Sequence, residues 1–169
     1  MLTDNTTPKT PRCGSPKNGH QNMTTVRPLA PADRPEWEAL YQDYAAFYKV
    51  TQTFEMRATV WDWLHDPQHE SSALVAEQGG KLIGLAHYRG FARPLSATRG
   101  LFLDDLFVDP AARGAGGAKM LLVELRAIAR VKGYSVIRWI TADNNYRARG
   151  LYDQMADRTG WITYDLKPH

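Results

Sequence analysis

An apolar stretch, a glycine-rich loop and a helix-like segment follow one another without a break in this 169-residue chain, and they constrain its fold more than any other feature. The apolar stretch TRGLFLDDLFVD (98–109) is typical of a β-strand, and AKMLLVELRAIARVKG (118–133) has the apolar spacing of a helix. The loop PAARGAGG (110–117) surrounds one arginine with small residues. Because backbone N–H groups in the first turn of a helix are free, this pattern predicts an anion site.

The rest of the chain from Met23 alternates between strand-like and helix-like segments, which predicts one domain over residues 23–169. Gly79 and Gly80 lie between two of the strands and predict a hairpin turn. Strands mixed with helices predict an α/β or α+β fold around one sheet. We expect strands at 24–30, 71–78, 81–92, 98–109, 134–141 and 161–167, and helices at 31–50, 53–66, 118–133 and 144–160.

Residues 1–22 differ from the rest of the chain in composition. They contain three prolines among Thr, Asn, Ser, Gly and Gln, and no aromatic residue. Such a segment buries too little apolar surface to offset the loss of chain entropy on folding. We therefore expect residues 1–22 to form a disordered N-terminal tail.

Charge and cysteine content restrict the class of protein. The formal net charge is +3, and no block of Lys and Arg stands out, so we expect no nucleic-acid partner. No apolar run approaches ~18 residues and none lies at the N-terminus, so we expect no membrane span and no secretory signal. Cys13 is the only cysteine, which excludes an internal disulfide and a cysteine-ligated metal site. These features favour a cytoplasmic protein without a metal.

The glycine loop does not match the two commonest phosphate-binding motifs. A dinucleotide fingerprint needs a third glycine where Lys119 stands, and a P-loop needs Gly-Lys-Ser/Thr where Lys119 lies between Ala118 and Met120. The pattern Arg/Gln-x-x-Gly-x-Gly/Ala does match, from Arg113 to Ala118. With LFVDP before it and KMLL after it, the segment resembles the GNAT superfamily of N-acetyltransferases, which use acetyl-coenzyme A.

The resemblance implies a binding site for acetyl-coenzyme A. Its pyrophosphate would lie on the backbone of the loop, where small residues allow a close approach, and its pantetheine would bond to the strand. The alternative is a plain glycine turn with an exposed arginine. The residues implied are Leu106, Phe107, Val108, Arg113, Gly114, Ala115, Gly116, Gly117, Ala118 and Lys119.

A second motif, NNYRARGLYDQM, supports the first. Asn145, Ala148 and Tyr152 share one face of the expected helix. This resembles the GNAT helix that lies along the pantetheine, where the asparagine contacts the cofactor and the tyrosine protonates the departing thiolate. An unperturbed phenol has a pKa near ~10, so Tyr152 would be protonated at neutral pH. The alternative for a lone tyrosine is ordinary packing.

The family also implies a fold. It is a twisted mixed sheet of six to seven strands, with helices on both faces and a central splay between two parallel strands. Those strands would be LDDLFVD (103–109) and YSVIRWIT (134–141). The segments quoted above are most similar to the subgroup named for histone and polyamine acetylation. GNAT enzymes in general are often dimers. A homodimer in which residues 161–167 pair across the interface is therefore one possibility.

Asp104 is the candidate proton acceptor. Alternation along a strand places Asp104 and Asp105 on opposite faces, with Asp104 beside Phe102, Leu106 and Val108. In the subgroup a glutamate at the position of Asp104 relays a proton from the substrate amine, usually through water. The alternatives are that Asp104 only attracts the ammonium ion or bonds to a loop. We expect a structural role for Asp105.

The acceptor pocket is less clear from the sequence. In the family the first two helices wall it, and here they offer Tyr44 and Tyr48, whose rings suit a cation. Arginines at 89, 93 and 99 would instead suit an acceptor with a carboxylate. We expect an N-acetyltransferase that acts on a primary amine by direct attack in a ternary complex. The rivals are a non-catalytic acyl-coenzyme A sensor and an interaction module, which would need neither Tyr152 nor Asp104.

Overall fold

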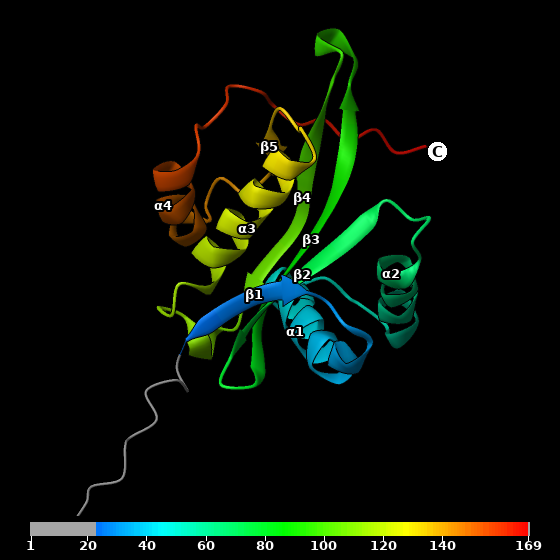
Figure 1. Ribbon diagram of the computed structural model, residues 1–169, viewed down its shortest axis with the longest axis vertical. Coiled ribbons are helices and arrows are strands. Elements are labelled where there is room, and N and C mark those ends of the chain that lie inside the picture. Colours follow the sequence, from blue (N-terminus) through cyan, green and yellow to red (C-terminus); the bar gives the residue numbers. More distant parts are fainter. Residues whose placement is uncertain (1–22, 169) are drawn as a thin grey trace, which may run out of the picture.

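The computed structural model describes residues 23–168, so the prediction for residues 1–22 lies outside the described part. The described residues form five strands and four helices, with short 3₁₀ turns at three of the connections (Figure 1). The strands are β1 (Thr24–Pro28), β2 (Ser71–Gln78), β3 (Lys81–Arg93), β4 (Thr98–Val108) and β5 (Ile137–Arg138). The helices are α1 (Arg34–Phe47), α2 (Phe54–His65), α3 (Gly117–Val131) and α4 (Tyr146–Met155).

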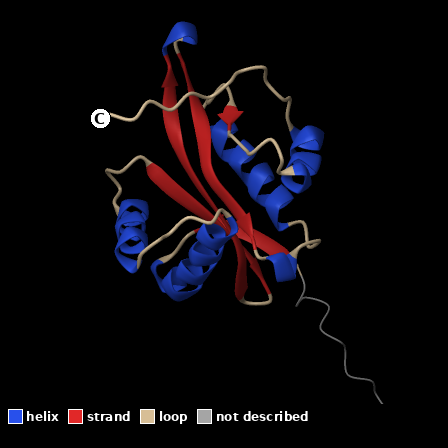
Figure 2. Ribbon diagram, turned by 180° about the vertical axis from the view of Figure 1, so that it is seen from behind, coloured by secondary structure: helices blue, strands red, loops and turns tan. Residues whose placement is uncertain are grey.

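One mixed sheet forms the centre of the molecule, in the order β1-β2-β3-β4-β5. The first four strands are antiparallel, and β5 is parallel to β4. Helices α1 and α2 cover one face and α3 and α4 the other (Figure 2). The predicted α/β architecture with helices on both faces is confirmed.

The number of strands is smaller than the predicted six to seven, because the described residues form five. The expected last strand, 161–167, pairs with nothing in the sheet, and its Trp161 and Leu166 are 85% and 96% exposed. The expected strand 134–141 is reduced to Ile137 and Arg138. An edge only two residues long offers almost no hydrogen-bonding ladder to which a further strand could add.

Two apolar cores lie on the two faces of the sheet. On one face Trp37 of α1 and Trp61 of α2 pack on the strands. On the other, Leu121 and Leu125 of α3, which are one helical turn apart, are completely buried. The sheet therefore lies between two separate layers of helices. The orientation of the helices in each layer determines which of their side chains face the site described below.

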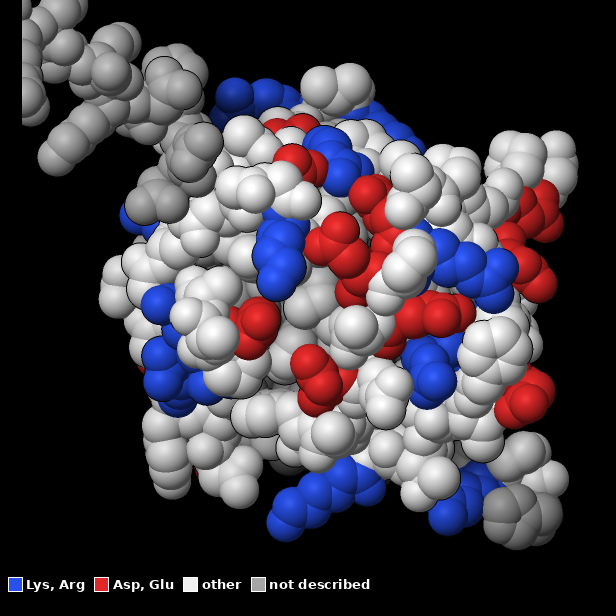
Figure 3. Space-filling model, turned by 90° about the horizontal axis from the view of Figure 1, so that it is seen from below, with Lys and Arg blue, Asp and Glu red and all other residues white. Residues whose placement is uncertain are grey.

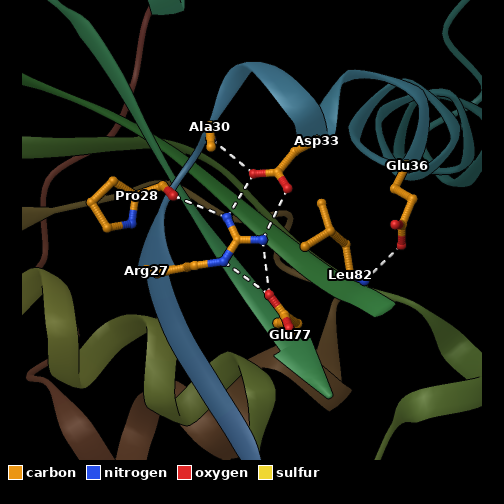
Figure 4. Close-up of polar contacts among 7 residues, drawn as sticks. All are labelled: Arg27, Pro28, Ala30, Asp33, Glu36, Glu77 and Leu82. Carbon is orange, nitrogen blue, oxygen red and sulfur yellow. Dashed lines mark hydrogen bonds and ion pairs between the residues drawn. The ribbon is translucent and has the colours of Figure 1, made fainter. Parts of the chain in front are cut away.

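Polar contacts attach the start of α1 to the sheet (Figure 4). The Arg27 guanidinium donates to both oxygens of Asp33, at 2.6 and 2.9 Å, and to Glu77 of β2 at 2.9 Å. Glu36 in the first turn accepts a hydrogen bond from the backbone N–H of Leu82 in β3 at 2.8 Å. These bonds connect α1 to three strands and so set the direction in which its tyrosines point.

A β-bulge interrupts the pairing of β3 with β4. His87 is opposite Asp105 and Tyr88 is opposite Leu103, which leaves Asp104 without a partner on β3. The extra residue shifts the alternation of faces: Leu103 packs under α3, whereas Asp105 bonds to Tyr41 of α1.

The bulge corrects the expected placement of the two carboxylates. Leu106 and Val108 belong to the core under α3, while Asp104 contacts Arg89 and not that core. Arg89 lies over the ring of Phe102, and its neighbour in sequence, Tyr88, faces α3. Asp104 therefore extends toward the α1 side, as Asp105 does. The prediction of opposite faces is wrong because a regular alternation was assumed.

Candidate active site

A cleft opens where the two parallel strands separate. β5 pairs with β4 only through Ile137 and Arg138, opposite Leu101 and Phe102. β4 then continues to Val108 with β3 on one edge and no strand on the other. The cleft has a volume of about 450 Å³. It lies at the expected position of the central splay.

Most of the predicted site residues line this cleft. They are Leu106, Phe107, Val108, Arg113, Gly114, Gly116, Gly117, Ala118, Lys119, Asn145, Ala148 and Tyr152 on the cofactor side, and Tyr44 and Tyr48 on the acceptor side. Ala115 does not line it, because its carbonyl turns toward β1 and accepts a hydrogen bond from Thr24 at 3.4 Å. Asp104 does not line it either. Ala112, Arg147 and Leu151 do line it and were missed; Leu151 was detectable because it follows Ala148 by three residues on the same helix.

The start of α3 has the geometry of an anion site. Gly114 and Gly116 have φ angles of +94° and +78°, which residues with side chains rarely adopt. A Cβ at either glycine would meet nothing within 4 Å, so the space above the loop is open. Gly116 is the N-cap of α3 and supplies no side-chain cap, so the N–H groups of the first turn remain available to a ligand.

Helix α4 forms the opposite wall of the cleft. Asn145 is its N-cap, and the side-chain oxygen accepts a hydrogen bond from the N–H of Ala148 at 3.4 Å. Two turns later the ring of Tyr152 packs against Trp139, with ring centroids 5.2 Å apart. Burial, followed by the nearby Tyr48, raises the pKa of Tyr152 to about 12. The phenol is therefore protonated at neutral pH and can donate a proton.

Asp104 is held by an arginine on the neighbouring strand. Arg89 Nε donates to Asp104 Oδ1 at 3.3 Å, and Arg89 Nη1 lies 3.9 Å from Glu70. Burial raises the pKa of Asp104 above its usual value, and the charge of Arg89 opposes that shift in part. A carboxylate with a raised pKa is a better proton acceptor than an ordinary aspartate.

Asp105 belongs to a separate network whose other end, at His87 and Trp37, is buried. His87 Nδ1 lies 2.8 Å from Asp105 Oδ2, and the Tyr41 hydroxyl donates to the same oxygen at 3.3 Å. The indole N–H of Trp37 donates to His87 Nε2 at 2.9 Å. Sequence analysis gave Asp105 only a structural role, and no signal in the sequence reveals the bulge that brings Asp104 to the same side.

Within residues 23–168 no helix is long and apolar enough to cross a membrane. No group of three or more His, Cys, Asp or Glu side chains that could hold a metal ion occurs in the same part of the chain. On the face shown in Figure 3, Lys and Arg are interspersed with Asp and Glu.

Comparison with known proteins agrees with this geometry. The sequence is 26% identical to the D-amino-acid N-acetyltransferase HPA3 of Saccharomyces cerevisiae over 151 residues, which cover 88% of this chain and 94% of the relative. It is 29% identical to the uncharacterized N-acetyltransferase YhfO of Bacillus subtilis over 143 residues, 83% of this chain and 95% of the relative.

The fold is similar to that of the aminoglycoside N-acetyltransferase AAC(6')-Iy, whose structure was solved in complex with CoA. The TM-score is 0.74 at 17% identity, over 88% of this chain and 97% of that one. The acetyltransferase (GNAT) family matches residues 37–156, from α1 to the end of α4. The chain therefore belongs to the GNAT family and is an N-acetyltransferase.

Proposed function

We propose that this enzyme transfers the acetyl group of acetyl-CoA to a primary amine by direct attack in a ternary complex. The observation that carries the proposal is one cleft in which an uncapped helix start, the free edge of β4 and a protonated tyrosine converge. The described residues fit acetyl-CoA, because the open space above Gly114 and Gly116 admits a phosphate that a Cβ would obstruct. When bound, acetyl-CoA supplies an activated acetyl carbon and a sulfur leaving group.

The residues around the cleft bind the donor in a defined direction. First-turn N–H groups of α3 hold the pyrophosphate, and the backbone of Leu106–Val108 bonds to the pantetheine as an added strand does. This direction brings the acetyl end to Tyr152. Tyr44 and Tyr48 of α1 line the same cleft, so the acceptor approaches from the α1 side.

Two protons must leave the ammonium group of the acceptor as the C–N bond forms and the C–S bond breaks. Asp104 takes the first proton through a water molecule and passes it to solvent, which its raised pKa favours. Tyr152 gives its hydroxyl proton to the departing sulfur and recovers a proton from the nitrogen through water. The net reaction consumes one ammonium and one thioester, and yields an amide, a thiol and one proton.

The acceptor is tested by an amine panel. Thiol release from acetyl-CoA is measured with polyamines, lysine peptides and both configurations of free amino acids. Free amino acids are included because the yeast relative is named for them and because Arg89 lies beside Asp104. Binding of acetyl-CoA without amine-dependent thiol release by any acceptor would contradict the proposal and favour an acyl-CoA sensor.

We also propose a homodimer in which each copy receives segment 161–167 of the other. Trp161, Ile162, Tyr164 and Leu166 are at least three-quarters exposed, which is unusual for four large apolar side chains in one segment. A hollow of about 420 Å³ beside α3 and β5, lined by Leu122, Ala129, Ile137 and Trp139, is available to receive them. Light scattering of the full chain and of a chain ending at Ala156 tests this: dimer and monomer are expected, and a monomeric full chain would refute it.

A further inference from the structure

We propose that Asp105 binds the ammonium group of the acceptor, and that His87 and Tyr41 fix the orientation of its carboxylate for that purpose. The observation is a partly exposed carboxylate, 22% accessible, whose hydrogen-bond donors come from the acceptor side of the molecule. The proposal rests on the proposed function, because it assigns the acceptor end of the same site.

The buried residue Trp37 determines which atom donates and which accepts in each hydrogen bond of this network. The indole N–H of Trp37 can only donate, so His87 Nε2 must accept and cannot carry a proton. The proton of the neutral ring is therefore on Nδ1, from which it is donated to Asp105 Oδ2. Trp37 is completely buried and His87 is 4% exposed, so neither can rotate freely. His87 thus acts as a fixed hydrogen-bond donor and carries no charge.

Both donors end on one oxygen of the carboxylate. His87 and the Tyr41 hydroxyl bond to Oδ2, and the Tyr44 hydroxyl is a further hydrogen-bonding neighbour of the carboxylate. The two oxygens of an ionised carboxylate accept about four hydrogen bonds in all, so an N–H donor from a ligand can still bind to Asp105.

The charge on Asp105 has no cationic partner in the described chain. Its hydrogen-bonding neighbours are the neutral side chains of His87, Tyr41 and Tyr44. Arg89, the cation of the adjoining strand, pairs with Asp104 and Glu70 instead. The surrounding titratable groups therefore leave one negative charge uncompensated, and an ammonium group supplies the missing positive charge.

Tyr44 connects Asp105 to the cleft. Its ring centroid is 5.7 Å from that of Phe107, and both residues line the cleft. Burial first, and then the charge of the nearby Asp105, raises the pKa of Tyr44. An amine held on Asp105 is thus at the α1 wall of the cleft, next to Asp104, which takes its proton.

The test compares two acceptor probes of similar size. Benzylamine is charged at pH 7, whereas aniline is not. Binding of each is measured by calorimetry to the full chain saturated with CoA, for the wild type and for Asp105→Asn, which keeps the shape and removes the charge. We expect Asp105→Asn to weaken benzylamine roughly ten- to a hundred-fold, as for loss of a hydrogen bond to a charged group, and to leave aniline and CoA unchanged.

The positioning role of His87 is tested by rescue. His87→Leu removes the donor, whereas His87→Asn puts an amide N–H near the position of Nδ1. We expect benzylamine affinity to fall in the first and to recover largely in the second. Tyr41→Phe, which removes only a hydroxyl, gives the same information if His87→Leu does not fold, and it should weaken benzylamine less than Asp105→Asn does.

Binding separates this proposal from the proposed function. If Asp105→Asn weakens benzylamine selectively, the ammonium site is supported whether or not acetyl transfer is detected. If the wild type binds benzylamine no better than aniline, or if Asp105→Asn weakens both probes equally, the ammonium site is wrong even when transfer occurs. Equal benzylamine affinity in His87→Leu, His87→Asn and the wild type would overturn the positioning role.

Discussion

The two walls of the cleft are built in different ways. The wall to which we assign the cofactor consists of the end of β4, the loop and first turn of α3, and one face of α4, and it presents mainly backbone groups and small residues. The acceptor wall consists of Tyr44, Phe47 and Tyr48 of α1, and behind it lies a network of side chains that are far apart in the sequence, Trp37, His87 and Asp105. Backbone recognition depends on local conformation, whereas the acceptor wall depends on how separate layers pack.

The largest effect is expected from a change in the cofactor wall. Gly116→Val places a branched side chain in the open space above the loop, so the pyrophosphate loses its N–H donors. Losing two hydrogen bonds to a charged group corresponds to roughly a hundred-fold weaker binding of acetyl-CoA. The measurement is the Kd for acetyl-CoA by calorimetry.

Gly80→Val is the matched control for this change. Gly80 has a φ of +77°, close to the +78° of Gly116, and its Cβ would also meet nothing within 4 Å. It lies in the β2–β3 turn and does not line the cleft. Both variants carry the same backbone strain, so a similar loss of affinity in both would mean that the loop is not the phosphate site.

An effect of similar size, but on turnover alone, is expected at Tyr152. Tyr152→Phe keeps the ring on Trp139 and removes the proton donor, so kcat should fall by ~10²-fold, the low end for general acids. Acetyl-CoA affinity should not change. Because the pKa of Tyr152 is about 12, the wild type should lose this proton donor only above that pH. Tyr48→Phe is the control, and an equal loss of kcat in both would argue against Tyr152 as the acid.

The acceptor wall is tested through the pH dependence of turnover. Arg89 lowers the pKa of Asp104, so Arg89→Leu should raise it further. Asp104 must be unprotonated to accept a proton, and the acidic limb of the pH–rate profile should therefore move to higher pH, with slower turnover near pH 6. Arg93→Leu, which loses only a hydrogen bond to Ser135, should leave the limb in place. An unmoved limb in Arg89→Leu would remove Asp104 from the proton path.

The smallest effect is expected where α1 is attached to the sheet. Asp33→Asn loses the charged bond to Arg27 and should lower the free energy of unfolding by about 1–2 kcal/mol at pH 7. Urea unfolding measures it, with Glu38→Gln as the control, whose exposed pair with Arg34 is worth less than ~0.5 kcal/mol. Because α1 carries the acceptor tyrosines, Asp33→Asn should also raise KM for the amine more than Kd for acetyl-CoA.

The pH dependence of this variant has a defined sign. The hydrogen bond from Arg27 lowers the pKa of Asp33 below its usual 3.8. A lowered pKa in the folded state stabilises the protein above the unfolded value, and that stabilisation disappears as the pH falls through the folded value. The difference between wild type and Asp33→Asn should therefore be complete at pH 7 and shrink below about pH 4. A difference that stays constant down to pH 2 would show that the ion pair is not its source.

The sequence by itself determined the cofactor wall and the order of the elements. The strand, the glycine loop and the start of α3 depend on hydrogen bonds between near neighbours and on the missing side chains of Gly114 and Gly116. The apolar spacing of Leu121 and Leu125 and the N-cap at Asn145 are equally local signals. Such features form within one turn or one strand, so a linear pattern is sufficient to predict them.

Only the tertiary structure determines how the residues of the acceptor wall are arranged and whether the chain after α4 joins the sheet. The bulge at Asp104 lies where β3 and β4 pair between the two apolar cores. No pattern of residues in the sequence predicts its position. The bulge places Asp104 on the α1 side together with Asp105, whose partners His87 and Trp37 are brought together only by the packing of α1 on the sheet. Segment 161–167 has the composition of a strand, but pairing needs an edge, and β5 offers only two residues. A β-strand forms only when a second strand offers hydrogen-bonding partners, so the sequence of one segment cannot determine whether it becomes a strand.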